Sequence, residues 1–176
     1  MNNKQMLLAG LILVGGASVI GSYVYGFLTH SGSINDFWGA SPEVFKTVNI
    51  PFMILAAIGF IGFTYFILFR IKTNEVKIAN RFSYNIFFII FTIILFPSAF
   101  WMPLTLSMIA NPDDGIWIII RVILAIVGVS SVALILMLIS IKPKYPGIVY
   151  WFAVGGAIAF SIQTFVFDTF LWPLFF

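Results

Sequence analysis

Five long apolar stretches constrain this chain more than any other feature of its sequence. They lie approximately at residues 5–28, 48–70, 83–110, 115–141 and 147–175. A helix needs roughly 20 mostly apolar residues to cross the hydrocarbon core of a bilayer. Because lipid offers no partner to backbone N–H and C=O groups, spanning segments of this kind are expected to be helical. The sequence therefore predicts an all-α polytopic membrane protein, a single five-helix transmembrane bundle that takes up residues 1–176.

Composition supports lipid as the solvent and removes several classes of chemistry. The chain is 61% apolar and only 9% charged, whereas a soluble domain carries about 25% charged residues. It has no cysteine, which excludes disulfides, thiol catalysis and cysteine-ligated metals. A single histidine, His30, excludes haem held by two histidines of one chain. The net charge of +3 comes from basic residues near the ends of the apolar stretches, so we expect no nucleic-acid partner.

Basic residues in the connecting segments predict the orientation. Lys4 precedes the first stretch, and the second and fourth connections are basic. The first connection has few basic residues, and the third carries Asp113 and Asp114 with none. Since lysine and arginine accumulate on the cytoplasmic side, we expect a cytoplasmic N-terminus and an outer C-terminus in a plasma membrane or its topological equivalent. Only the first connection, residues 29–47, is long enough to fold over the outer end as a lid.

Two ionisable residues, Arg121 and Asp168, fall inside the apolar stretches, where charge is costly. Counted from the helix ends they lie about 9 and about 12 Å below the outer surface. Two interpretations stay open. In the first, the residues form a buried ion pair between antiparallel helices. In the second, Arg121 extends to the outer headgroups, and Asp168, which leans inward, needs another partner, a wet cavity or a proton.

Other polar and irregular features gather in the same outer half. Ala157, Ser161, Thr164, Asp168 and Trp172 share one helical face, and Trp117 and Arg121 share another. Pro97 and Pro103 flank Trp101 in the third stretch, where each removes a backbone hydrogen bond and favours a bend beside a pocket. Interhelical packing explains the small residues equally well. The predicted ligand-binding residues are Trp101, Arg121, Asp168, Thr164, Trp117, Trp172, Ser98 and Tyr25.

Three segments of the chain resemble the translocator protein family, also called TspO or the peripheral benzodiazepine receptor. Phe37 to Phe45 is similar in kind to the family's tryptophan- and proline-rich first loop, and Ser98 to Pro103 keeps the tryptophan and proline of its third helix. Tyr145 to Trp151 is similar, with altered spacing, to the pattern before its fifth helix. The family's double-proline loop motif and helix-five Leu-Asn are missing. The resemblance implies a pocket for a flat apolar ligand such as a tetrapyrrole or sterol, lined by Trp101 and covered by the first loop.

These features favour a membrane binding protein or transporter for a small apolar molecule or lipid. The alternative is a non-catalytic accessory subunit of a larger membrane complex, or a homodimer, whose helices pack against partners. A third hypothesis, a lipid-modifying enzyme, lacks support because the sequence shows no nucleophile–base pair, no group of metal ligands and no phosphate-binding glycine loop. We expect no dedicated cofactor and no metal; a bound lipid, sterol or tetrapyrrole would be a ligand.

Overall fold

The computed structural model describes residues 1–29 and 36–176, and the chain forms a bundle of five long helices. The helices are α1 (Asn3–Thr29), α2 (Glu43–Phe69), α3 (Ile86–Ala110), α4 (Asp114–Ile139) and α5 (Ile148–Ser161). The last of these continues as a π-helix, η3 (Ile162–Leu171), and a 3-10 turn, η4 (Trp172–Phe175). With α5 to η4 taken as one span, the described residues contain five helices long and apolar enough to cross a membrane. The all-α bundle predicted from the sequence is therefore confirmed.

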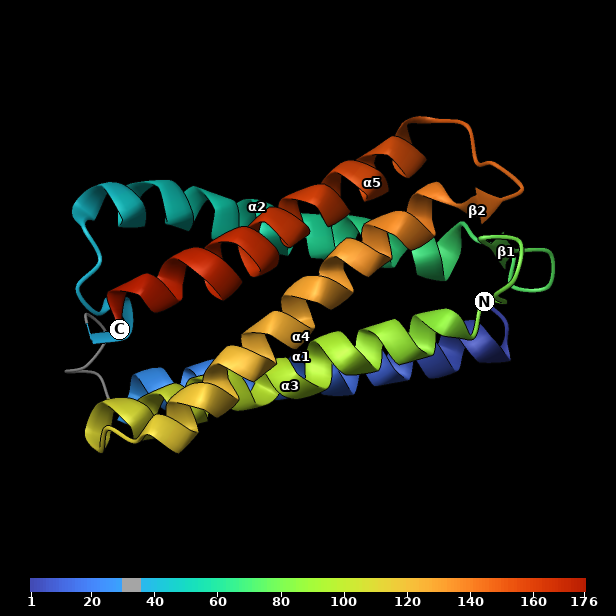
Figure 1. Ribbon diagram of the computed structural model, residues 1–176. Coiled ribbons are helices and arrows are strands. Elements are labelled where there is room, and N and C mark those ends of the chain that lie inside the picture. Colours follow the sequence, from blue (N-terminus) through green and yellow to red (C-terminus); the bar gives the residue numbers. More distant parts are fainter. Residues whose placement is uncertain (30–35) are drawn as a thin grey trace.

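The helices form a closed ring in which each contacts its two neighbours. Figure 1 shows α2 packed along α5 and α1 packed along α3, with α4 crossing between the two pairs. Contacts between α1 and α2 complete the ring. The N-terminus lies beside the α2–α3 and α4–α5 connections, which we call the N-terminal end (Figure 1). The C-terminus, the α3–α4 turn and the 3-10 turn η2 (Asp36–Trp38) lie at the opposite C-terminal end.

The main core fills the half of the bundle toward the N-terminal end. Phe63, Phe66 and Phe91 are at most 1% exposed there, and Phe63 packs on Phe160 with ring centroids 5.6 Å apart. In a lipid environment the hydrophobic effect would drive little association between such helices, and van der Waals contact would take its place. The backbones of α2 and α5 approach closely at Gly59 and Gly156, where a Cβ on Gly156 would lie 2.7 Å from the Cα of Gly59.

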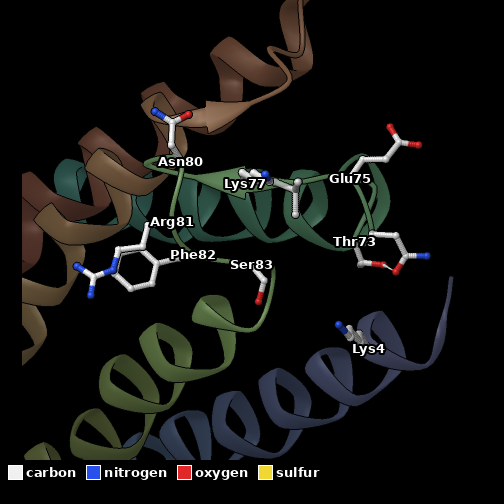
Figure 2. A pocket seen from close by; sticks show the side chains of 10 residues that line it. Lys4, Thr73, Glu75, Lys77, Asn80, Arg81, Phe82 and Ser83 are labelled. Carbon is white, nitrogen blue, oxygen red and sulfur yellow. Dashed lines mark hydrogen bonds between the residues drawn. The ribbon is translucent and has the colours of Figure 1, made fainter.

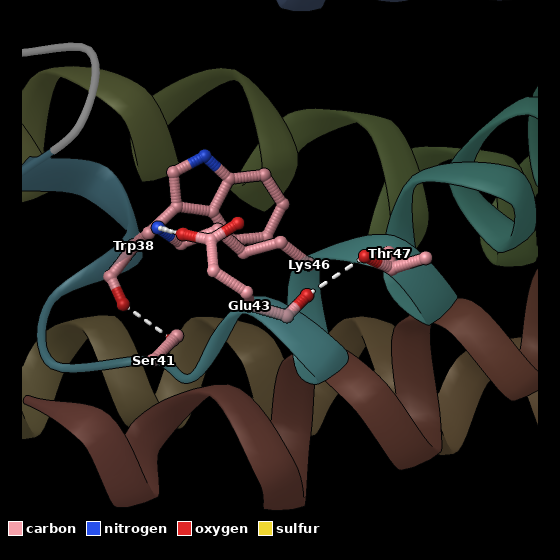
Figure 3. A network of polar contacts seen from close by, with 5 residues as sticks. All are labelled: Trp38, Ser41, Glu43, Lys46 and Thr47. Carbon is pink, nitrogen blue, oxygen red and sulfur yellow. Dashed lines mark hydrogen bonds and ion pairs between the residues drawn. The ribbon is translucent and has the colours of Figure 1, made fainter.

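The second helix begins at Glu43, five residues before the start expected from hydropathy. Its first turns are polar, and they are stabilised locally: Lys46 pairs with Glu43 at 2.8 Å, and the Thr47 hydroxyl donates to the Glu43 carbonyl at 2.9 Å (Figure 3). Polar side chains lower hydropathy without interrupting backbone hydrogen bonds, so the helix extends beyond the apolar stretch. The expected lid, residues 29–47, is correspondingly shorter, and its residues 30–35 lie outside the described part of the chain.

The connections at the N-terminal end are held together by a two-stranded sheet and by side-chain hydrogen bonds. Strand β1 (Lys77–Ile78) pairs antiparallel with β2 (Ile141–Lys142), which links the α2–α3 and α4–α5 connections. The Tyr84 hydroxyl donates to the Ile67 carbonyl at 3.2 Å, and Gln5 of α1 donates to the Ile71 carbonyl at 3.1 Å. These bonds fix the three segments at this end to one another.

Candidate functional site

The π-helical segment η3 brings together side chains that an α-helix would separate. Residues five apart lie about 140° apart around an α-helix, whereas π-helical turns join residues i and i+5. Gln163 therefore reaches Asp168, with its Nε2 donating to Oδ1 at 2.8 Å. The Thr169 hydroxyl likewise lies 2.8 Å from the Thr164 carbonyl, five residues earlier, and it shares its one proton between this oxygen and the Leu124 carbonyl at 2.9 Å. Such π-helical turns are frequent at functional sites, which makes η3 a candidate part of a functional site.

A third polar side chain completes a buried group. Asn49 on α2 is 2% exposed, and its Oδ1 accepts a hydrogen bond of 3.0 Å from Gln163 Nε2. The amide nitrogen of Gln163 thus serves both Asn49 and Asp168, while its Oε1 is buried and has no partner among the described residues. We call Asn49, Gln163 and Asp168 the polar triad. Unsatisfied buried polar atoms cost about 1–3 kcal/mol, so an amide oxygen that lacks a partner among the described residues lowers stability.

An aromatic cluster lies toward the C-terminal end. The ring of Trp101 on α3 lies 5.6 Å from that of Tyr23 on α1 and 5.8 Å from that of Trp172 between centroids. Trp172 also lies 5.8 Å from Trp117. Trp101 Nε1 is buried and, among the described residues, has no acceptor. The aromatic cluster and the triad together leave one unused donor and one unused acceptor.

The segment after residue 35 closes the C-terminal end over these rings. Phe37 is buried against Met102 and Leu106 of α3, and the Trp172 indole donates to the Phe37 carbonyl at 2.8 Å. The Ala40 amide donates to the Phe175 carbonyl at 2.9 Å. Gly39 has a φ of +53°, a left-handed conformation that glycine adopts without strain. Ser41 donates to the Trp38 carbonyl (Figure 3), so this part of the first connection is a structured cover.

A separate set of hydroxyls joins α4 to α5 and η3. The Ser131 and Ser161 oxygens are 3.1 Å apart, and Thr164 donates to Ser131 at 2.8 Å. Gly128 leaves room for this approach, because a Cβ there would lie 2.6 Å from the Thr169 hydroxyl. Every member is satisfied within the protein, so these hydroxyls hold helices together. Thr164, a predicted ligand-binding residue, belongs to this structural set.

Arg121 and Asp168 do not form the expected ion pair. Within the described residues the ion pairs are Lys46–Glu43 and Lys72–Glu75, and Arg121 is exposed on the outer surface of α4. Its neighbour Ile120 is the residue that α4 buries against the aromatic cluster, and successive residues are rotated by about 100°. The structure therefore agrees with the second interpretation, in which Arg121 turns outward and Asp168 finds another partner, Gln163.

The remaining predicted residues divide between the site and its surroundings. Trp101, Trp117 and Trp172 meet in one cluster, as described above. Ser98 is half-buried and donates to the Ile94 carbonyl at 2.6 Å, a bond within α3. Tyr25 is 57% exposed, and the tyrosine that contacts Trp101 is Tyr23. The site residues that the sequence analysis did not select are Asn49, Gln163, Tyr23 and Phe37.

Two of these missed residues had a signal in the sequence. Asn49 and Gln163 are amides inside apolar stretches, where an uncharged polar side chain also needs a partner. The residues predicted from the sequence were charged, hydroxyl-bearing or aromatic, and neither amide was among them. The pairing of Gln163 with Asp168 had no comparable signal, because it depends on π-helical geometry.

Neither of the two best-formed cavities lies at this site; both are at the N-terminal end, one along the α2–α3 connection and one around residues 145–150. The described residues contain no group of three or more His, Asp or Glu side chains that could hold a metal ion. No family model, no curated protein and no solved structure matches this chain.

Proposed function

We propose that this protein is a multi-pass membrane protein that binds a small, mostly apolar molecule between the polar triad and the aromatic cluster. The observation that carries the proposal is the pair of buried, unused hydrogen-bonding atoms, Trp101 Nε1 and Gln163 Oε1. Ligand sites are lined mainly by apolar and aromatic groups with a few convergent polar atoms. Flat rings beside one donor and one acceptor fit that description.

The chemistry of the site favours a neutral polar group on the ligand. A ligand hydroxyl can accept from an N–H such as Trp101 Nε1 and can also donate to an oxygen such as Gln163 Oε1. An ionised carboxylate can only accept, so it would leave Gln163 Oε1 without a donor. A sterol-like molecule therefore fits better than a tetrapyrrole with ionised propionates, the two ligand classes that the resemblance to the TspO family suggests.

Charge distribution supports insertion with the N-terminal end in the cytoplasm. Seven of the nine lysine and arginine residues lie at that end, and the exceptions are Lys46 and Arg121. The C-terminal end carries Asp36, Glu43, Asp113 and Asp114. By the positive-inside rule, the proposed site and its cover then face the outside of a plasma membrane or its equivalent.

Purification of the whole chain in a mild detergent, followed by mass spectrometry of co-purifying small molecules, tests the proposal. We expect a stoichiometric apolar molecule that Trp101→Phe depletes, because this change removes the indole donor and keeps an aromatic ring. Trp151→Phe is the matched control, since Trp151 is 67% exposed on α5, away from the site. Equal retention of the molecule in both variants would contradict binding at Trp101.

A specific observation on α1 favours the alternative function of an accessory subunit. Gly10, Ala17 and Gly21 share one exposed face of α1, and a Cβ at Gly10 or Gly21 would meet nothing within 4 Å. Small residues of this kind let a neighbouring helix approach closely. The same purification separates the alternatives, because a stoichiometric partner protein without any small molecule would support the subunit.

A further inference from the structure

The α2–α3 connection and the start of α1 border an open cavity at the N-terminal end. Its volume is about 420 Å³, and Figure 2 shows Lys4 on α1 facing the connection that carries the other lining residues. Three cations line it, Lys4, Lys77 and Arg81, against one acid, Glu75. Glu75 forms an ion pair with Lys72, which does not line the cavity; the Lys72 Nζ to Glu75 Oε1 distance is 3.4 Å. The cavity is therefore electropositive.

These three cations have no ion-pair partner in the described part of the chain. The pairs found there involve Lys46 and Lys72 alone among the basic residues, while the Arg81 guanidinium carbon lies 5.6 Å from the centre of the Phe82 ring. Neutral hydrogen-bonding side chains line the same space, including Asn74, Asn80 and Ser83. Cations combined with neutral donors suit the oxygens of a phosphate group.

The backbone that presents these side chains is held in an unusual conformation. Ala79 and Asn80 have φ values of 52° and 58°, and alanine rarely adopts this region. The turn is fixed by mutual hydrogen bonds between Ile78 and Phe82, 2.8 and 2.9 Å long, and by the pairing of Lys77 with Lys142 across the strands. Strained backbone that its surroundings hold in place is typical of functional sites.

We infer that this cavity binds a phosphate group, supplied either by the headgroup of an anionic lipid or by a soluble phosphate. The positive-inside rule accounts for basic residues at this end. It does not account for three of them meeting in one cavity, unpaired among the described residues, together with neutral donors. Basic pockets on the cytoplasmic side of membrane proteins bind phospholipid headgroups by the same chemistry. This inference stands independently of the ligand site at the other end of the bundle.

The test uses the whole protein in a neutral detergent, with native mass spectrometry and thermal unfolding as measurements. One arm adds phosphatidylglycerol or, as the zwitterionic control, phosphatidylcholine. The other arm adds sodium phosphate against sodium chloride at equal ionic strength. We expect one phosphatidylglycerol to be retained and to raise the melting temperature. If sodium phosphate stabilises the protein through the same residues and the lipid does not, the cavity binds a phosphate group that a soluble molecule supplies.

Substitutions locate the binding. Lys77→Gln and Arg81→Gln should each weaken binding about fivefold, as expected for one cation near a membrane surface. Arg70→Gln is the matched control, because Arg70 is an exposed cation at the same end that lines the other cavity. Should either of the first two variants unfold without added anion, Lys4→Gln on α1 repeats the test. Equal losses in Arg70→Gln, or no stabilisation by either anion, would overturn the inference.

Discussion

Asp168 shows how much of a buried acid's environment a sequence specifies. Its place inside an apolar stretch predicts that it needs a partner, and the structure supplies one in Gln163. The identity of that partner could not be predicted, because five-residue spacing places two side chains on different faces of an α-helix. Arg121, an opposite charge at similar depth, was the more obvious candidate, yet it is exposed.

Replacing Asp168 separates its hydrogen bond from its charge. Asp168→Leu removes the acceptor for Gln163 Nε2, and we expect the free energy of unfolding to fall by about 1–3 kcal/mol. Asp168→Asn keeps an acceptor oxygen and should cost less than half as much. Unfolding of the purified variants in detergent, followed by tryptophan fluorescence, provides the measurement.

A double-mutant cycle identifies the partner of Asp168. The effects of Asp168→Leu and Gln163→Leu should be non-additive, since both remove the same contact. Those of Asp168→Leu and Arg121→Gln should add to within about 0.5 kcal/mol, as for independent sites. A coupling free energy above about 1 kcal/mol between residues 121 and 168 would instead support the ion-pair interpretation.

At the scale of elements, hydropathy predicts which segments become long helices and is less informative about their ends and internal geometry. Both ends of α1 lie within two residues of the expected positions. The polar start of α2 and the π-helical turns of η3 were not foreseen. The first depends on local pairing of Glu43 with Lys46, and the second on side chains bonded across helices, such as Thr169 to the Leu124 carbonyl at 2.9 Å.

The contact between α2 and α5 depends on two glycines, and Gly59→Ala tests it. The added Cβ would collide with the backbone of Gly156, which cannot move without shifting α5. Overpacking of this kind costs about 1–3 kcal/mol, so the melting temperature should fall. Gly10→Ala is the control, since its Cβ meets nothing within 4 Å and alanine favours helix by about 1 kcal/mol. Equal stability of the two variants would show that the helices do not meet at Gly59.

The cover over the C-terminal end depends on the bond from Trp172 to the Phe37 carbonyl. Trp172→Phe keeps an aromatic ring and removes this bond, which is worth about 1 kcal/mol. Local opening of residues 36–42 should therefore become about fivefold more frequent, and limited proteolysis there correspondingly faster. Trp101→Phe is the control, because the indole N–H that it removes has no partner among the described residues. A similar acceleration in both variants would mean that the Trp172 bond does not hold the cover.

Across the whole molecule, the ring of helices separates two chemically different ends. The N-terminal end carries most of the basic residues and the electropositive cavity, and the C-terminal end carries the aromatic cluster, the polar triad and four acidic side chains. The alternation of basic and acidic connections along the sequence already predicts this polarity. The convergence of distant residues, such as Lys4 with Arg81 or Asn49 with Gln163, follows from the packing of the ring and is not visible in any one segment.

The proposed orientation predicts which connections can be reached from outside the cell. Because the chain has no cysteine, a single introduced thiol can report this without background labelling. Asn74 and Asn111 are exposed asparagines in connections at opposite ends of the bundle, so single Asn74→Cys and Asn111→Cys variants each carry one thiol. In intact cells, a membrane-impermeant maleimide should label the cysteine at 111 and should reach that at 74 only after permeabilisation. Each variant is the control for the other, because both replace an exposed asparagine with cysteine. Labelling of residue 74 in intact cells, with residue 111 protected, would invert the orientation and place the aromatic cluster and its cover on the cytoplasmic side.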